Sequence, residues 1–276
     1  MVNILKIHLI FFRFSIILDA LIAYMISSIR LNKYLAQKGY CSRRKADEFI
    51  ASGKVMVNGK IVKELGTKVD PEKDKVEVAD RKAHKQASND NQRKVYIALN
   101  KPIDYITSTT GDQGQSVMIL ITPENQLNSK TSHESPITNH RLYPVGRLDK
   151  DSEGLVLLTN DGELTQTLTH PSFEHEKEYE ITIDKQLSTD ARKILQSGMI
   201  IDETTIEGIT ITKEWNQGKR VVITIVLKEG KNRQLRKMFG RLGYHVIALK
   251  RTRIGKTTLA TLPIGRWRFV EKKNII

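Results

Sequence analysis

The segment YPVGRLDKDSEGLVLLTNDGEL, residues 143–164, carries the side chains whose types and spacing most favour chemistry. A turn containing Gly146 is expected to present Asp149 directly before a hydrophobic strand. An ionised carboxylate held against a sugar or a ring can act as a nucleophile or as a base. The sequence favours neither role, and a plain acidic turn, the commonest use of an Asp-rich loop, is the alternative.

A calcium loop is another interpretation of the same residues. Asp149, Asp151, Glu153 and Gly154 follow the order of the first half of such a loop. The loop needs a bidentate Glu at its twelfth position, which is Asn160 here, and the strand that follows is too apolar for it. The pattern therefore disfavours calcium, and we predict no metal site.

Basic residues gather in the last quarter of the chain. Residues 229–253 contain eight Lys and Arg against Glu229 alone, a net charge of +7. Such a cluster suits RNA phosphates and structured RNA loops. For any single member, a solvated surface position is the alternative. The candidate RNA contacts here are Lys231, Arg233, Lys237, Arg241, Arg251 and Arg253.

The chain of 276 residues has a formal net charge of +14, and 39% of its residues are hydrophobic. One large or two ordinary domains can therefore form. The charge predicts attraction to polyanions, so RNA, DNA and anionic membranes are all possible partners on this ground. Cys41 is the only cysteine in the sequence, which excludes a disulfide framework and fits an intracellular, cytoplasmic protein. We expect Cys41 to be buried rather than nucleophilic.

Residues 1–29 are strongly apolar, but Lys6, Arg13 and Asp19 interrupt them. No charge-free run approaches the roughly 18 residues of a spanning helix. There is no clean small-residue cleavage site, which disfavours a signal peptide. We interpret this segment as an upstream extension ahead of Met25, with a membrane anchor as the alternative.

Residues 30–80 predict a small domain of two helices and a hairpin. Leu31 and Leu35 share one helical face, and Ser42 can cap a second helix. The stretch KVMVNGKIV predicts two strands joined by a type I′ turn at Asn58-Gly59. Residues 30–78 hold 12 Lys and Arg against 7 Asp and Glu, which suits a phosphate backbone. The candidate RNA contacts are Lys33, Lys38, Arg43, Arg44, Lys45 and Lys54.

Residues 81–93 have no apolar period and predict a linker. Residues 94–276 predict a second domain of the α+β class with a mixed, largely antiparallel sheet, because several strands are joined too closely for helical crossovers. Residues 124–139 are polar and predict a surface loop. The expected strands are VYIALN, GLVLLT, EYEITI, IEGITI and RVVITIVL, and the expected helices lie near 163–169, 188–197 and 232–242.

Two stretches resemble known families. The stretch RLNKYLAQKGYCSRRKADEFIASGKVMVNGKIV resembles the RNA-binding domain named after small-subunit ribosomal protein S four. The stretch VGRLDKDSEGLVLLTNDGEL resembles the catalytic motif of the RsuA/RluB/RluE/RluF pseudouridine synthases. The family's further motifs follow in order as YIALNKP, HPSFEHEKEY, KEGKNRQLRKM and IGRWRFV, and HEKEYEITID points to the RluF-like branch. The chain departs from the family's usual KPxG at residues 101–104, which puts the local turn in doubt.

The resemblance implies an enzyme that isomerises a uridine in ribosomal RNA and needs no cofactor. It assigns the catalytic carboxylate to Asp149, a guanidinium that keeps this carboxylate ionised to Arg236, and the aromatic side chain against the base to Tyr179. Arg147 is a candidate for filling the position that the flipped base leaves. The implied partner is 23S ribosomal RNA, free or in an assembling subunit, bound by a monomer. A synthase acting on 16S ribosomal RNA and a non-catalytic ribosome assembly factor are the alternatives.

Overall fold

The computed structural model describes residues 28–38, 40–79, 93–127, 141–169 and 175–276. The chain divides into two compact units at Gln92/Arg93. Residues 1–27 of the expected extension and most of the expected linker lie outside the described residues, as does Gly39. No helix among the described residues is long and apolar enough to cross a membrane.

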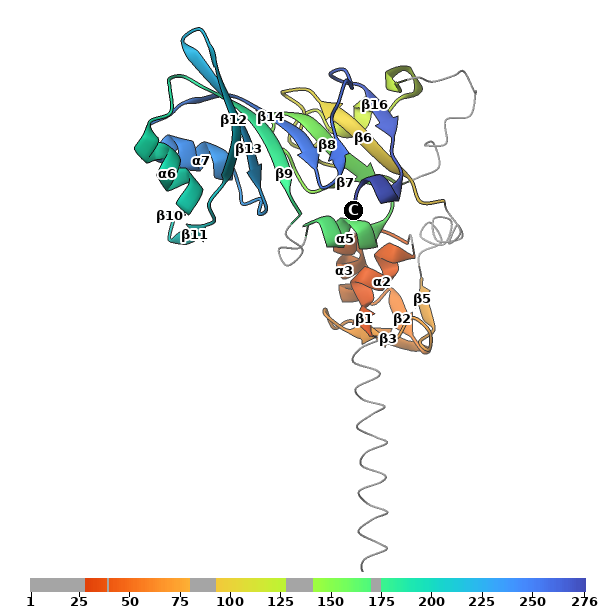
Figure 1. Ribbon diagram of the computed structural model, residues 1–276. Helices are drawn as coiled ribbons and strands as arrows, with labels where there is room; N and C mark the ends of the chain where they lie inside the picture. The colour runs from red at the N-terminus through yellow and green to blue at the C-terminus, as the bar shows by residue number, and fades with distance from the viewer. Residues whose placement is uncertain (1–27, 39, 80–92, 128–140, 170–174) are drawn as a thin grey trace, which may run out of the picture. The chain divides into compact units, whose positions relative to one another are not determined.

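The first unit is built from two short helices and small sheets (Figure 1). Helix α2 spans Leu31–Gln37 and helix α3 spans Arg43–Ala51. The Ser42 hydroxyl accepts a hydrogen bond from the Lys45 backbone N–H, which confirms the predicted cap. Apolar residues of both helices pack with the strands into one core, and Cys41 is buried in it, as predicted.

The predicted hairpin of this unit is confirmed. Strands β2 (Val55–Val57) and β3 (Lys60–Val62) are antiparallel, and β5 (Val76–Val78) pairs with the other edge of β2. Both turn residues, Asn58 and Gly59, have positive φ, as a type I′ turn requires. The sequence did not predict β1 (Ile29–Arg30) and β4 (Lys68–Val69), which pair over two residues only.

The second unit contains one large mixed sheet, whose strand order in the described residues is β12-β13-β9-β14-β8-β6-β16, with β15 on β14 and β7 on β8. A separate hairpin pairs β10 with β11. The strands are β6 (Tyr96–Lys101), β7 (Tyr143–Val145), β8 (Glu153–Thr159), β9 (Lys177–Ile183), β10 (Met199–Ile201), β11 (Thr204–Ile206), β12 (Thr210–Gln217), β13 (Arg220–Leu227), β14 (Val246–Ile254), β15 (Thr257–Thr258) and β16 (Trp267–Phe269). The largely antiparallel sheet agrees with the prediction.

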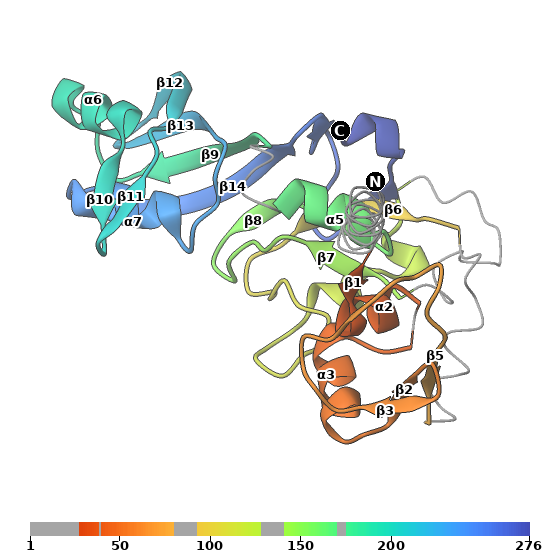
Figure 2. The ribbon, with the colours of Figure 1, turned by 90° about the horizontal axis from the view of Figure 1, so that it is seen from below.

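One parallel pair joins two halves of this sheet. Among the described strands, only β14 and β8 are parallel neighbours, and their register contains two residue pairs, Lys250 with Glu153 and Arg251 with Gly154. We call this pair the seam. Strands β12, β13, β9 and β14 lie on one side of it and β8, β6 and β7 on the other (Figure 2), with β16 paired to β6. The backbone pairing between the two halves is therefore short.

The helices of the second unit are α5 (Gly162–Thr169), α6 (Thr189–Ser197) and α7 (Gln234–Arg241), with 3₁₀ turns at η1 (Val117–Leu120), η2 (Pro123–Asn125) and η4 (Lys272–Asn274). All three predicted helices are present. The side chains of α6 and α7 belong to an apolar core that spans both halves of the sheet, since it contains residues of β6, β8 and β16 as well as of β9 and β13. Those of α5 complete a second core against β6, β7 and β8.

The strands and one loop differ in part from the prediction. The expected strand IEGITI is two strands, because β11 ends at Ile206 and β12 begins at Thr210. Five strands of the second unit are not among the predicted ones: the short β7, β10, β15 and β16, and the long β14, whose residues read as a basic cluster. The expected surface loop begins with η2 and a bridge from Gln126 to Trp267, and its remainder, 128–139, lies outside the described residues.

Candidate active site

Asp149 lies in the turn between β7 and β8, and 30% of its side chain is exposed. Two residues ahead of it, Arg147 is exposed, and its side chain has no hydrogen bond or ion pair to any described residue. The backbone oxygen of Asp149 accepts a hydrogen bond from the Ser152 N–H, which closes the turn. The Asp149 side chain is therefore presented directly ahead of strand β8, as predicted.

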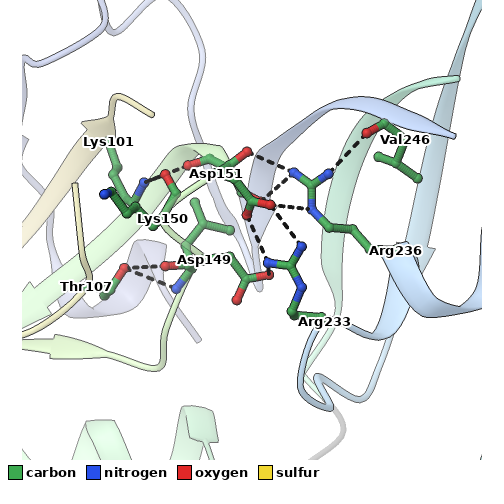
Figure 3. A network of polar contacts seen from close by, with 10 residues as sticks. Lys101, Thr107, Asp149, Lys150, Asp151, Arg233, Arg236 and Val246 are labelled. Atoms are coloured by element: carbon green, nitrogen blue, oxygen red, sulfur yellow. Dashed lines mark hydrogen bonds and ion pairs between the residues drawn. The ribbon is translucent and has the colours of Figure 1, made fainter. Parts of the chain in front are cut away.

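The backbone of this turn is held from the β6 side by two side chains (Figure 3). The Thr107 hydroxyl donates to the Leu148 oxygen at 2.7 Å and accepts from the Leu148 N–H at 3.1 Å. The Lys101 ammonium is fully buried and donates to the oxygens of Ser152 at 2.6 Å and Lys150 at 3.4 Å. Burial lowers the pKa of Lys101 to about 8, against the opposing charges of Asp151 and Asp149.

Two guanidinium groups hold the same turn from across the seam. The Arg251 side chain is 3% exposed, and it donates to the Leu155 oxygen at 2.7 Å and the Arg147 oxygen at 3.3 Å. Arg236 donates to the Asp151 oxygen at 2.8 Å. Cationic donors on backbone carbonyls form stronger hydrogen bonds than neutral ones. The turn carrying Asp149 is therefore fixed through its backbone, while its carboxylate stays accessible.

Asp149 itself is paired with Arg233, whose Nη1 lies 3.7 Å from its Oδ2. Arg233 also forms a two-pronged hydrogen bond with Asp151, at 3.2 and 2.9 Å. Burial raises the pKa of Asp151, but the hydrogen bonds from Arg233 and the charges of Arg236 and Arg233 outweigh it and hold this pKa below its ordinary value. The hydrogen bond to Asp151 raises the pKa of Arg233. The Asp151 carboxylate and the Arg233 guanidinium therefore both stay ionised.

The expected salt bridge between Arg236 and Asp149 is wrong in this structure. The Arg236 Nε lies 3.3 Å from the Oδ2 of Asp151, and its two other nitrogens donate to Asp151, Ser152 and Val246. Figure 3 shows Arg233 between Arg236 and the Asp149 carboxylate. Arg233 lies directly before α7 and has a left-handed φ of 51°. Its side chain therefore points in a different direction from that of a residue inside the helix.

A pocket of about 420 Å³ opens beside Asp149. Tyr179 lines it from β9, where the register places it opposite Arg251 of β14. The tyrosine is buried, and its hydroxyl makes no hydrogen bond to any described residue. Arg147 and Arg233 line the same pocket, whereas Arg236 does not. The structure therefore brings Asp149 and Tyr179 to one cavity, and Arg236 is not part of its lining.

The basic residues expected to contact RNA fall into three groups. In the first unit, Lys33 and Lys38 are half-buried, whereas Arg43, Arg44, Lys45 and Lys54 are exposed. The ammonium groups of Lys45 and Lys54 each lie 5.6 Å from the centre of the Phe49 ring. Cations gathered in this way over one ring form a basic surface on the first unit.

In the second unit, most of these cations already have carboxylate partners. Lys231 pairs with Glu229 at 2.8 Å, Lys237 with Asp202 at 2.7 Å, and Arg253 with Glu176 at 3.0 Å. Arg241 is exposed without an ion pair in the described part of the chain.

The prediction that Arg251 contacts RNA phosphates is wrong. Its guanidinium is buried and donates hydrogen bonds to the backbone oxygens of Arg147 and Leu155. The reason is the strand that the sequence did not reveal: in β14 the side chains alternate between the two faces of the sheet, and Arg251 lies on a covered one.

Sequence reasoning missed several residues that shape the site. Lys101 and Thr107 hold the turn, and the half-buried Lys177 lines the pocket and donates to the oxygens of His175 and Lys228. Burial and the charge of Arg251 lower the pKa of Lys177. The available signal for Lys101 was its position at the end of an apolar strand, directly before Pro102. Within the described residues, no group of three or more His, Cys, Asp or Glu is arranged to hold a metal ion.

Comparison with known proteins identifies the two units. The family described as RNA pseudouridylate synthase matches residues 95–240, which span the Asp149 turn, Tyr179 and both arginines. The chain belongs to the RNA pseudouridylate synthase family. The S4 domain matches residues 29–76, within the first unit.

Curated relatives cover most of the chain. The dual-specificity RNA pseudouridine synthase RluF of Escherichia coli strain K12 is 36% identical over 91% of this chain and 78% of its own length. The ribosomal large subunit pseudouridine synthase B of Bacillus subtilis is 36% identical over 86% of this chain and 89% of its own. A crystal structure of a pseudouridylate synthase has a TM-score of 0.58 at 24% identity, covering 90% of this chain and 98% of that one, which shows the shared fold.

Proposed function

We propose that the protein converts a uridine of large-subunit, 23S, ribosomal RNA to pseudouridine, with Asp149 as the catalytic carboxylate. The observation that carries the proposal is a single cavity lined by Asp149, Arg233 and Tyr179. The relatives named as RluF and as large-subunit synthase B support the choice of RNA. The S4 domain supports an RNA partner bound by both units.

The reaction breaks the bond between uracil N1 and ribose C1′ and forms a bond between C5 and C1′. The C5 proton is lost and N1 gains one, so the product is an isomer and no electrons are exchanged. A carboxylate can serve this exchange against the ribose or the ring, provided that it is ionised. Arg233 places a guanidinium group 3.7 Å from the Asp149 carboxylate.

The other pocket residues position the target nucleotide. The base must leave its stack to reach Asp149, which costs a few kcal/mol. Tyr179 offers an aromatic face to the extruded base, and Arg147, without a side-chain partner, is placed to fill the vacated position in the RNA. Arg236 acts through Asp151 and the turn, and is therefore a positioning residue in this proposal.

The proposal extends to the setting of the reaction. The enzyme works as a cytoplasmic monomer without a cofactor, on free RNA or on an assembling subunit. In this proposal the chain consists of an extension at 1–29, an S4-type domain at 30–80, a linker at 81–93 and a catalytic domain at 94–276. The alternatives, a non-catalytic assembly factor and an enzyme acting on 16S ribosomal RNA, give different results in the experiment that follows.

The test uses Asp149→Asn, which keeps the shape of the side chain and removes its charge. We expect pseudouridine formation on a 23S transcript to fall below detection while RNA binding persists. Asp190→Asn, an exposed carboxylate in the first turn of α6, is the matched control and should leave turnover unchanged. Substantial turnover by the Asp149 variant would overturn the assignment. A wild-type protein that binds but modifies neither ribosomal RNA would be an assembly factor.

A further inference from the structure

The second unit contains another pocket, of about 660 Å³, which shares no lining residue with the Asp149 pocket. Its walls come from the start of β6, from β15 and β16, and from the turn η4 near the C-terminus. Strands β6 and β16 are neighbours in the sheet (Figure 1). Four basic residues line it: Arg93, Lys94, Lys256 and Arg268.

These four cations have no ion pair with any described carboxylate. Glu271, the acidic residue in the wall, is paired with Lys273 at 2.6 Å. The charge of Lys94 helps to lower the pKa of Asp161, but the ion pair of Asp161 is with Lys272, at 3.4 Å. Arg268 donates to the Thr258 backbone oxygen, which leaves its charge uncompensated. Uncompensated cations around a concave surface attract a polyanion.

This arrangement contrasts with the basic cluster of residues 229–253. There, Lys231, Lys237 and Arg253 are each paired with a carboxylate within 3.0 Å. A phosphate that binds those three side chains must compete with a carboxylate, whereas a phosphate in the second pocket need not.

An aromatic ring at the rim adds a second kind of contact. Phe269 is 40% exposed, and its ring meets the fully buried Trp267 edge to face at 5.2 Å between centres. This contact fixes the exposed ring in place. A nucleic-acid base can stack on such a ring. Cations with an adjacent exposed ring suit single-stranded RNA better than an isolated phosphate.

Strand β14 connects the two pockets. Ile254, at its end, lines the Asp149 pocket, and Lys256, two residues later, lines the second pocket. The linings of the two pockets are therefore only two residues apart along this part of the chain. We propose that the second pocket binds the backbone and one base of the RNA strand that flanks the target uridine. The inference rests on the proposed function, because it assumes that RNA occupies the Asp149 pocket.

The experiment measures binding of the full-length chain to a 23S transcript as a function of salt. The variant Arg93→Gln/Lys256→Gln removes two exposed charges, neither of which has a described side-chain partner. Losing two phosphate contacts should reduce the slope of log affinity against log salt by about 1.4. We expect affinity to fall about tenfold and the single-turnover rate at saturating RNA to remain unchanged. Phe269→Ala should lower affinity without changing the slope, because stacking involves no counterion.

The matched control is Lys193→Gln/Arg220→Gln, which removes two exposed cations of α6 and β13 that line neither pocket. The proposal is overturned if the Arg93/Lys256 variant keeps the slope and affinity of this control. It is also overturned if the variant loses its rate at saturation with unchanged affinity. Binding is measured independently of product formation, so a failure of the proposed function would not be mistaken for a failure of this inference.

Discussion

Arg233 and Arg236 converge on one oxygen atom, the Oδ2 of Asp151, at 2.9 and 3.3 Å. Only Arg233 reaches beyond it to Asp149. The two guanidinium groups therefore have different tasks: Arg233 pairs directly with the carboxylate of Asp149, and Arg236 holds the backbone of the turn. Both contacts cross the seam, so they also tie the halves of the sheet together.

The first prediction separates these tasks. Arg233→Ala should lower the single-turnover rate at saturating RNA by about 100-fold, the scale of losing one charge-stabilising donor, with little change in thermal stability. Arg233→Lys should keep part of the activity, because it retains the charge without the planar fork. Arg236→Ala should lower both rate and melting temperature, since it leaves the backbone oxygen of Asp151 without its donor. Lys237→Ala, whose partner Asp202 is remote from the turn, is the control. Equal rates for the Arg233 and Lys237 variants would contradict the assignment.

The second prediction concerns Gly154 at the seam. Its φ is +107°, and a Cβ there would lie 2.3 Å from the backbone oxygen of Arg251. Gly154→Ala should destabilise the protein by about 3 kcal/mol, from strain and overpacking together. The melting temperature should then fall by about 6–12 °C for a unit of this size. Gly218→Ala is the control, because Gly218 also has positive φ but no atom within 4 Å of the added Cβ. A loss no greater than the control's would mean that the seam can widen freely.

The third prediction concerns pH. Lys101 loses its proton at about pH 8 in the folded protein, because burial lowers its pKa. Its charge then no longer supports the hydrogen bonds to Ser152 and Lys150, so the single-turnover rate should fall as pH rises through about 8. The effect of Lys101 on stability runs in the opposite direction. Its pKa is lower in the folded than in the unfolded chain, so its contribution to the free energy of unfolding rises between about pH 8 and about 10.5.

The measurement compares rate and melting temperature at each pH, for the wild type and for Lys101→Met. We expect the wild-type rate to fall without a matching loss of stability, and the variant to give a lower rate that is level through the same range. A wild-type rate that stays level to about pH 10 would show that the charge of Lys101 has no part in catalysis.

The fourth prediction tests the corrected role of Arg251. Arg251→Met should leave RNA affinity and its salt dependence unchanged, because a buried guanidinium neutralises no phosphate. The rate at saturation should fall, since the oxygens of Arg147 and Leu155 lose their donor and the turn loosens. Filter binding over a series of salt concentrations and single-turnover kinetics decide the matter. A smaller salt slope for this variant would restore Arg251 to the phosphate contacts.

The sequence predicted the elements whose pattern is local. Ser42, the Asn58-Gly59 turn and strand β13 follow from side chains within a few residues of one another. Strand β14 could not be recognised in the same way, because three basic residues interrupt VIALKRTRI and hide its alternation. Its burial depends on β9 and β8, which lie far away in the sequence.

The same limit applies to the site. The position of Asp149 before a strand was predictable from its own segment. Which arginine faces it was not, because that depends on the left-handed φ of Arg233, a property of the loop that leads into α7. Lys101 donates to backbone oxygens 49 and 51 residues away, and no pattern within its own strand encodes those partners.

The residues that form the site come from both sides of the seam. The β8 half of the sheet carries Asp149, while the β9 half carries Tyr179, the helix α7 with its arginines and the long β12–β13 hairpin. Strand β12 is the outermost strand of the β9 half, most of its residues are exposed, and none of them lines the Asp149 pocket. Natural variation, or an engineer, can therefore remodel this strand without replacing a residue that faces Asp149.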